Sequence, residues 1–299
     1  MDHTLSTFLS GCAPFHDLIF FAKSLDELEE ADQPNSTFLY IDGTSSYRYS
    51  ESTVSWPVIS LVTIKPEGAQ RTLFALGPNG ELWEGTAPDG KHVIGEIGLS
   101  GGAWRSLALV GDELFACGMA RLAAVRTGPL MWRDISAPPA IDDKLIVGFE
   151  SIDGFSANDL YAVGWQGEIW HRKSKRWRQI DSPVSSNLNA ICCSEDGIAY
   201  AVGDGGVMLR GRDDVWSEIV TGITDNLQDV RDFGGKVYVV TDFAILELAG
   251  SALKPVTAFA DPDDEPDTCL HLLKAVDGLV SLGQKDVFKL FGGKWQRVI

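Results

Sequence analysis

The stretch Ala190–Val220, AICCSEDGIAYAVGDGGVMLRGRDDVWSEIV, holds four short apolar runs, which are AICC, IAYAVG, GVMLRG and VWSEIV. Asp-Gly, Gly-Gly and Asp-Asp pairs stand between these runs, and such pairs favour tight turns. Four strands of this length, joined by turns this short, predict one antiparallel sheet in which each strand pairs with the next.

The same unit recurs along the chain, with the same order of apolar runs and turn formers. Its copies are Ser60–Ile97, Ser106–Ile135, Phe149–Ile180, Asp229–Val256 and Leu270–Ile299. The second run ends on Gly77, Gly118, Gly164, Gly203 and Gly283, with Thr241 in the remaining copy. The fourth run often carries a tryptophan, as at Trp132, Trp177, Trp216 and Trp295. A period of about 40 residues with four strands in each unit is typical of β-propeller blades.

The first 57 residues predict one more, irregular blade. Its expected strands are DLIFFAK, TFLYIDG, SSYRYSE and TVSWPVI, and Ser24-Leu25-Asp26-Glu27 fits a capping box that opens a short helix, SLDELEEA. We therefore expect an all-β fold, a seven-bladed β-propeller of four-stranded antiparallel blades. It forms a single domain over 1–299, with the irregular blade in 1–57 and six regular blades in 58–299. Six blades plus an N-terminal extension is the alternative.

The repeats, with LYAVGWQGEIWH, AYAVGDGGVMLRG and a following W-x-x-I, resemble bacterial β-propeller repeats of the kelch, sialidase-type and photosystem-assembly-factor-like group. The resemblance extends over Ser60–Ile299 and implies the propeller fold. The sialidase Asp-box, S-x-D-x-G-x-x-W, is intact in no blade, and the Gly-His and Trp-Asp pairs of WD repeats are missing. The resemblance therefore carries the fold and leaves the function open.

The chain is strongly acidic, with a net charge of −17 and a sequence pI of about 4.6. This charge argues against binding to nucleic acid, which depends on Lys and Arg at the phosphates, and against anionic membrane surfaces. It suits a basic protein partner, because complementary fields speed association. Solubility alone is the alternative explanation of the charge.

The acid is concentrated in two segments. Residues 1–57 and residues 225–267 each carry a net charge of −7, whereas residues 268–299 carry +3. In a closed ring the first and the penultimate blades both flank the last blade, so the two acidic segments are expected in one sector. The residues expected to contact a partner there are Asp261, Asp263, Asp264, Glu265, Asp267, Glu27, Glu29 and Glu30. The turns between second and third strands add Trp165, Asp204, Asp242 and Phe243.

No motif of catalysis, cofactor binding or metal binding stands out. The five histidines form no H-x-H or HExxH pair, and G-x-S-x-G, P-loop and dinucleotide patterns are missing. Asp204, Asp242, Glu81 and Glu168 sit in turns and keep glycoside chemistry open, and the acidic run Asp261–Asp267 keeps a calcium site open. We expect no catalytic residue, no metal and no cofactor.

Cellular context follows from the cysteines and the first residues. The five cysteines include the adjacent pair Cys192-Cys193 and no CxxC, which favours reduced thiols over a disulfide framework. The chain opens Met1-Asp2-His3-Thr4, without the basic start and apolar run of a signal peptide. These features predict a cytoplasmic protein. We also expect the unbound chain to be a monomer.

Three functions are compatible with these observations. The first is a non-catalytic protein-binding propeller, in its sharpest form an immunity protein that binds and neutralises a basic bacterial toxin. The second is a carbohydrate-active enzyme, a glycosidase or lyase that uses the axial pocket. The third is an assembly factor or scaffold, which the resemblance to photosystem-type propellers implies. The absence of a catalytic set favours the first.

Overall fold

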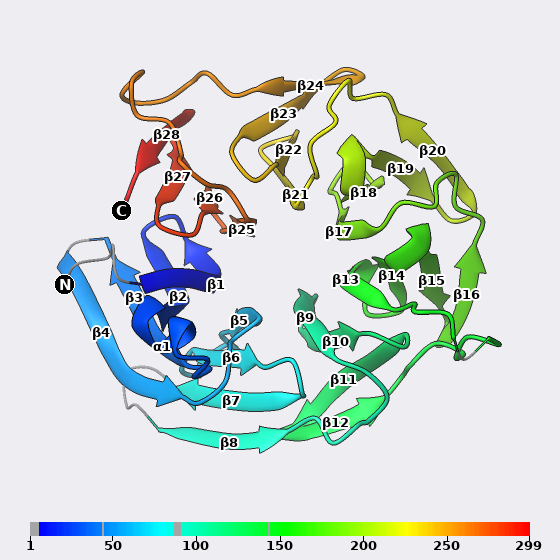
Figure 1. Ribbon diagram of the computed structural model, residues 1–299, viewed down its shortest axis with the longest axis horizontal. Coiled ribbons are helices and arrows are strands. Elements are labelled where there is room, and N and C mark those ends of the chain that lie inside the picture. Colours follow the sequence, from blue (N-terminus) through cyan, green and yellow to red (C-terminus); the bar gives the residue numbers. More distant parts are fainter. Residues whose placement is uncertain (1–5, 44, 87–90, 143) are drawn as a thin grey trace.

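The computed structural model describes residues 6–43, 45–86, 91–142 and 144–299, so the opening residues Met1–Thr4 lie outside the described residues. Seven antiparallel sheets of four consecutive strands stand around a central axis (Figure 1). The strands, from the first blade to the seventh, are β1 Ser6–Phe15, β2 Leu18–Leu25, β3 Ser36–Asp42, β4 Ser45–Val54; β5 Ser60–Ile64, β6 Thr72–Leu76, β7 Glu81–Thr86, β8 His92–Glu96; β9 Trp104–Val110, β10 Glu113–Gly118, β11 Leu122–Gly128, β12 Met131–Asp134; β13 Phe149–Ser156, β14 Asp159–Gly164, β15 Ile169–Lys173, β16 Arg176–Ile180; β17 Leu188–Cys193, β18 Ala199–Gly203, β19 Met208–Arg212, β20 Val215–Ile219; β21 Asp229–Phe233, β22 Lys236–Val240, β23 Ile245–Ala249, β24 Ala252–Pro255; β25 His271–Lys274, β26 Leu279–Leu282, β27 Val287–Phe291 and β28 Lys294–Arg297. The predicted seven-bladed propeller is confirmed, and the alternative of six blades is wrong.

In the first blade, the first three predicted strands take positions one later in the sheet than predicted. The innermost strand is β1, a segment that the prediction left out, and DLIFFAK forms β2, the second strand. TFLYIDG is the third strand, and SSYRYSE belongs to β4 together with Thr53 and Val54 of TVSWPVI. The remaining residues of TVSWPVI lie in the connection to β5, so the predicted fourth strand is wrong. The prediction left β1 out because this strand carries small and polar residues at buried positions, such as Ser6 and Ser10, so it lacks a continuous apolar run.

The predicted helix exists but is shorter than SLDELEEA and is capped differently. Helix α1 spans Asp26–Glu30 between β2 and β3, and Leu25 is its N-cap residue, with no side-chain capping bond. The Ser24 hydroxyl donates to Glu29 at 3.0 Å and bonds no backbone amide of the helix. The capping box is therefore wrong, and α1 is held from outside by tertiary contacts described below.

The repeated glycines have a steric cause. At Gly164 and Gly203, the ends of the second strands β14 and β18, an added Cβ would collide with the carbonyl oxygens of Gly148 and Asn187. Both carbonyls precede the innermost strand of the same blade, so the second strand ends in close contact with the entry of the first. Glycine is the residue that allows backbones to approach this closely.

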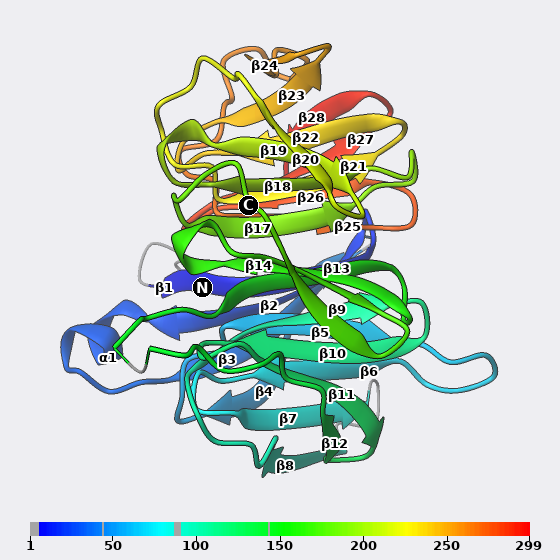
Figure 2. The ribbon, with the colours of Figure 1, turned by 90° about the vertical axis from the view of Figure 1, so that its right-hand side faces the viewer.

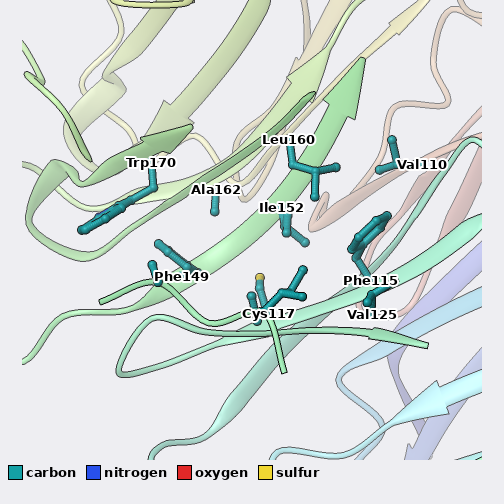
Figure 3. Packing of buried hydrophobic residues seen from close by; sticks show 12 residues of the cluster. Val110, Phe115, Cys117, Val125, Phe149, Ile152, Leu160, Ala162 and Trp170 are labelled. Carbon is teal, nitrogen blue, oxygen red and sulfur yellow. The ribbon is translucent and has the colours of Figure 1, made fainter. Parts of the chain in front are cut away.

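Apolar side chains fill the wedges between neighbouring blades. Between the third and fourth blades, Phe115 and Cys117 face Phe149 and Ile152 in one cluster, which Trp170 borders (Figure 3). Phe115, Cys117 and Phe149 are at most 2% exposed. Full burial of an aromatic side chain of this size stabilises the fold by about 1.5–3 kcal/mol. The blades are thus held together by side-chain packing rather than by shared strands.

The ring closes between the first and last blades in the same way. Each sheet consists of four consecutive strands, so among the described residues no strand of one end of the chain completes a sheet of the other. Phe8 and Phe21 of the first blade pack with Leu273 and Val280 of the last. The backbone amide of Phe8 donates to the carbonyl of Gln284 at 2.9 Å.

The two faces of the ring differ in the length of their connections. One face carries the connections between second and third strands and those between successive blades; we call it the long-loop face. The three longest connections, residues 26–35, 135–148 and 256–270, all lie on it, whereas the connections on the opposite face hold at most seven residues, in 65–71. In Figure 2, α1 protrudes on one side and the connection between β5 and β6 on the other. Long connections on one face of a rigid scaffold commonly carry binding function.

No helix in the described ranges is long and apolar enough to cross a membrane.

Candidate protein-binding surface

All twelve predicted contact residues lie on the long-loop face. Glu27, Glu29 and Glu30 belong to α1, and the run Asp261–Asp267 lies in the connection between β24 and β25. The remaining four occupy turns between second and third strands, at Trp165, Asp204, Asp242 and Phe243. The structure thus gathers on one face residues that the sequence placed in four different blades.

The acidic connection 256–270 runs along the outer edge of the last blade. Phe259 forms a parallel bridge with Trp295 of β28, and Ala260 donates to the carbonyl of Trp295 at 2.7 Å. Arg297 of β28 donates to Asp264 at 2.5 Å and to the carbonyl of Glu265 at 2.9 Å. The edge of the last blade is therefore covered, and Asp261, Asp263, Glu265 and Asp267 are left exposed.

The acidic helix α1 is tied to the same blade from the other side. Lys285, in the turn between β26 and β27, donates to Asp26 at 2.6 Å and to the carbonyl of Ser6 at 3.0 Å. The adjacent Asp286 accepts the backbone amide of Asp267 at 2.6 Å. One turn of the last blade thus contacts both acidic segments, as the closed ring required.

Three of the four turn residues use their polar groups within the chain. Asp204 accepts the side-chain amides of Asn187 and Asn189, each at 3.1 Å. The carboxylate of Asp242 accepts Gln228 at 2.7 Å. The indole of Trp165 donates to Glu150 at 2.5 Å, whereas Phe243 is 70% exposed and projects from its turn. Phe243 is therefore the best placed of the four to contact another protein, and contact by all four stays a prediction.

A second apolar element on the long-loop face was missed by the sequence reading. The connection 135–148 exposes Ile141, Leu145 and Ile146, and the carbonyl of Ile146 accepts the side chain of Gln166 at 3.2 Å. This connection joins the third and fourth blades, across the ring from the acidic connection 256–270 (Figure 1). The signal available in the sequence was the presence of two isoleucines, Ile141 and Ile146, in a long connection that also holds Pro138 and Pro139.

The central channel has a volume of about 920 Å³ and is lined by the innermost strand of every blade. Its carboxylates are already bonded: Asp153 accepts the amide of Cys193 at 2.7 Å, Asp229 that of Leu272 at 2.9 Å, and Asp232 the Lys274 ammonium at 2.8 Å. Glu150 accepts Trp165. Burial raises the pKa of Asp153, while the Cys193 amide and Arg231 act to lower it.

The carboxylates proposed for glycoside chemistry are not paired with each other. Glu168 is buried and forms an ion pair with Arg121, whose Nε donates to it at 2.9 Å. Glu81 accepts Asn79 at 2.9 Å. Glycosidases need two carboxyl groups facing one space about 5–10 Å across, and these carboxylates are each held by another partner in a separate turn.

The described residues form neither a metal-binding cluster nor a disulfide. In the part of the chain that the structure describes, no three His, Cys, Asp or Glu side chains are arranged to hold a metal ion. All five cysteines are free thiols. Burial raises the pKa of Cys12, Cys117 and Cys269 to about 12 each.

Comparison with solved structures supports the fold. No protein-family model matches the chain. The structure of YCF48 bound to D1 peptide superposes with a TM-score of 0.67 at 14% identity, covering 95% of this chain and 92% of that chain. The WD40 β-propeller domain of Doa1 gives a TM-score of 0.70 at 9% identity over the same shares. The propeller resemblance is confirmed at the level of the fold, and the grouping with kelch or sialidase-type repeats stays a prediction.

A curated relative supports the function. The Immune protein Tsi7 of Pseudomonas aeruginosa is 34% identical to this chain over 302 aligned residues, which cover 97% of this chain and 96% of the relative. The match extends over all seven blades, so it is not limited to a few shared repeats. The prediction of an immunity protein is confirmed, and the chain belongs to the family of the Immune protein Tsi7.

Proposed function

We propose that this immunity protein acts without catalysis, by binding a basic toxin directly through its long-loop face. The observation that carries the proposal is the convergence of both acidic segments on the turn that holds Lys285 and Asp286. Their exposed carboxylates attract a basic protein over distances of about a Debye length, roughly 8 Å at physiological salt. The long connections and exposed apolar side chains of the same face supply surface for close contact.

The proposal includes a cytoplasmic site of action and a monomeric unbound state. Five free thiols without a disulfide are in keeping with a reducing compartment. The channel carboxylates are engaged with amides and cations, which supports a binding role over an enzymatic one.

Two matched triple variants test the proposal against the toxin that the wild-type chain captures in a pull-down and that mass spectrometry identifies, inactivated by mutation. One variant combines Asp263→Asn, Glu265→Gln and Asp267→Asn on the acidic connection. The other combines Glu67→Gln, Asp112→Asn and Glu113→Gln on the opposite face. All six residues are exposed, and within the described residues none of their side chains forms a hydrogen bond or ion pair.

Both variants remove three negative charges, so a general effect of net charge would slow them equally. We expect the first to reduce the association rate several-fold and to flatten its salt dependence, with little change for the second. Equal rates for the two variants, or a wild-type chain that does not bind the toxin in stopped-flow or calorimetric measurements, would contradict the proposal.

A further inference from the structure

An apolar groove lies at the outer rim of the long-loop face, between the helical insertion of the first blade and the outer strand β8 of the second. Its volume is about 560 Å³. Its apolar lining consists of Leu25, Leu28, Pro34, Val54, Trp56 and Ile94. Ile94 is 58% exposed and Leu25 is 42% exposed. Contiguous exposed apolar side chains of this kind mark interaction sites in soluble proteins.

The groove is built firmly on one side. The Ser36 hydroxyl donates to the carbonyl of Trp56 at 3.0 Å and accepts the amide of Val58 at 2.8 Å, which fixes the connection that forms its floor. Trp56 also packs against the core between the first two blades. The other wall is α1, which buries none of its residues and is held by the bonds of Asp26 to Thr7 and Lys285. The groove is therefore a preformed cleft. One side is fixed by the bonds of Ser36, and the other is a helix, α1, with no buried residue.

The charges around the groove indicate its occupant. The segment 26–32 that forms the wall holds Asp26, Glu27, Glu29, Glu30 and Asp32 and no basic residue. Within the described residues, the side chains of Glu27 and Glu30 have no hydrogen bond or ion pair, and both are exposed. An apolar cleft with carboxylates on its rim complements an amphipathic segment that inserts an apolar side chain and carries Lys or Arg beside it. A second copy of this acidic chain would bring like charges together.

We propose that this groove is the anchoring site of the toxin, which it binds through an amphipathic basic segment. The inference rests on the function proposed above and adds the place of tightest contact. A buried apolar anchor surrounded by charge is the usual arrangement of binding energy in protein interfaces. The acidic segments then govern the rate of encounter, and the groove governs the lifetime of the complex.

Two neighbouring residues of β8 provide a matched test. Val93 and Ile94 are both exposed, at 46% and 58%, but successive side chains of a strand point to opposite faces, and only Ile94 lines the groove. The variants are Ile94→Ala, Ile94→Asp, Ile94→Lys and Val93→Lys, measured with the same inactivated toxin by surface plasmon resonance.

We expect Ile94→Asp to increase the dissociation constant about tenfold and Ile94→Lys about a hundredfold, because lysine also repels a basic segment. Val93→Lys should change it less than threefold. Hydrogen exchange of the wild-type complex should show protection in 25–37, 52–56 and 92–96, and this readout does not depend on the folding of any variant.

The outcomes separate the two proposals. If the wild-type chain binds the toxin but the Ile94 variants bind equally well and the three segments are unprotected, the groove proposal fails and the proposed function stands. If Ile94→Lys instead abolishes a dimer of this chain, the occupant is a second copy and the proposal is overturned. If the wild-type chain does not bind the toxin, both proposals fall.

Discussion

Lys285 in the last blade lies 2.6 Å from the carboxylate of Asp26 in the first blade, so this ion pair crosses the closure of the ring. Thr7 donates to the same carboxylate at 2.8 Å. Burial acts to raise the pKa of Asp26, but the bonds from Lys285 and Thr7 outweigh it and hold the pKa below the ordinary value of 3.8. The pair joins the first and last blades, whose described strands belong to separate sheets.

Asp26→Asn should lower the free energy of unfolding by about 0.5–1 kcal/mol at neutral pH, the range of partly exposed ion pairs. Because the folded pKa lies below the unfolded one, this stabilisation is present above the ordinary pKa of 3.8 and is lost as the pH falls through the lowered value. Urea denaturation of wild type and variant at neutral and acidic pH measures the difference. Glu27→Gln, on the same helix, is the control, and an Asp26→Asn difference that does not depend on pH would contradict the assignment.

Loss of the buried ion pair of Arg121 and Glu168 should lower the free energy of unfolding far more than loss of the pair of Lys285 and Asp26. The two side chains are 8% and 6% exposed, and Arg121 also donates to the carbonyl of Pro138 at 2.9 Å. Glu168→Gln leaves a buried guanidinium without its counter-charge, which typically costs about 3–5 kcal/mol. Thermal and urea denaturation should show this loss, and Arg121→Met with Glu168→Met together should cost less than the sum of the two single changes.

The exposed pair of Lys173 and Asp213 is the comparison for that measurement. These side chains are 57% and 51% exposed, so Lys173→Met should cost less than about 1 kcal/mol. Similar losses at the two sites would mean that solvent reaches Arg121 and Glu168.

The repeat made the blades predictable, because turn formers and end glycines recur where backbones touch, as at Gly164 and Gly203. The innermost strand of the first blade was not predictable, because several of its buried positions hold Ser6, Ser10 and Gly11 in place of an apolar run; a Cβ on Gly11 would lie 3.0 Å from Leu273. The meeting of the acidic segments followed from ring closure alone. The groove could not be predicted from the sequence. Its walls come from the first and second blades, and the way in which two blades pack side by side leaves no local sequence pattern.

Phe243 should matter for binding and not for stability. Its side chain is 70% exposed in the turn after β22, so Phe243→Ala should change the free energy of unfolding by less than about 0.5 kcal/mol. If the long-loop face binds the toxin, the affinity should fall about tenfold or more, as for aromatic contact residues. Val215→Ala, at a 78% exposed residue on the opposite face, is the control in the same calorimetric titration. Equal affinities for the two variants would place the turn of the sixth blade outside the interface.

The five thiols should report unfolding rather than surface reactivity. With the pKa of Cys12, Cys117 and Cys269 near 12, the reactive thiolate is about one part in ten thousand at pH 8. Burial also raises the pKa of Cys192 and Cys193. Labelling of the native protein with 5,5′-dithiobis(2-nitrobenzoate) should therefore be slow, and its rate should rise with urea in step with unfolding. Protein in guanidinium chloride should release all five equivalents at once. A thiol that reacts within seconds in the native state would contradict the prediction, because the reagent would then reach it through the central channel or between blades without global unfolding.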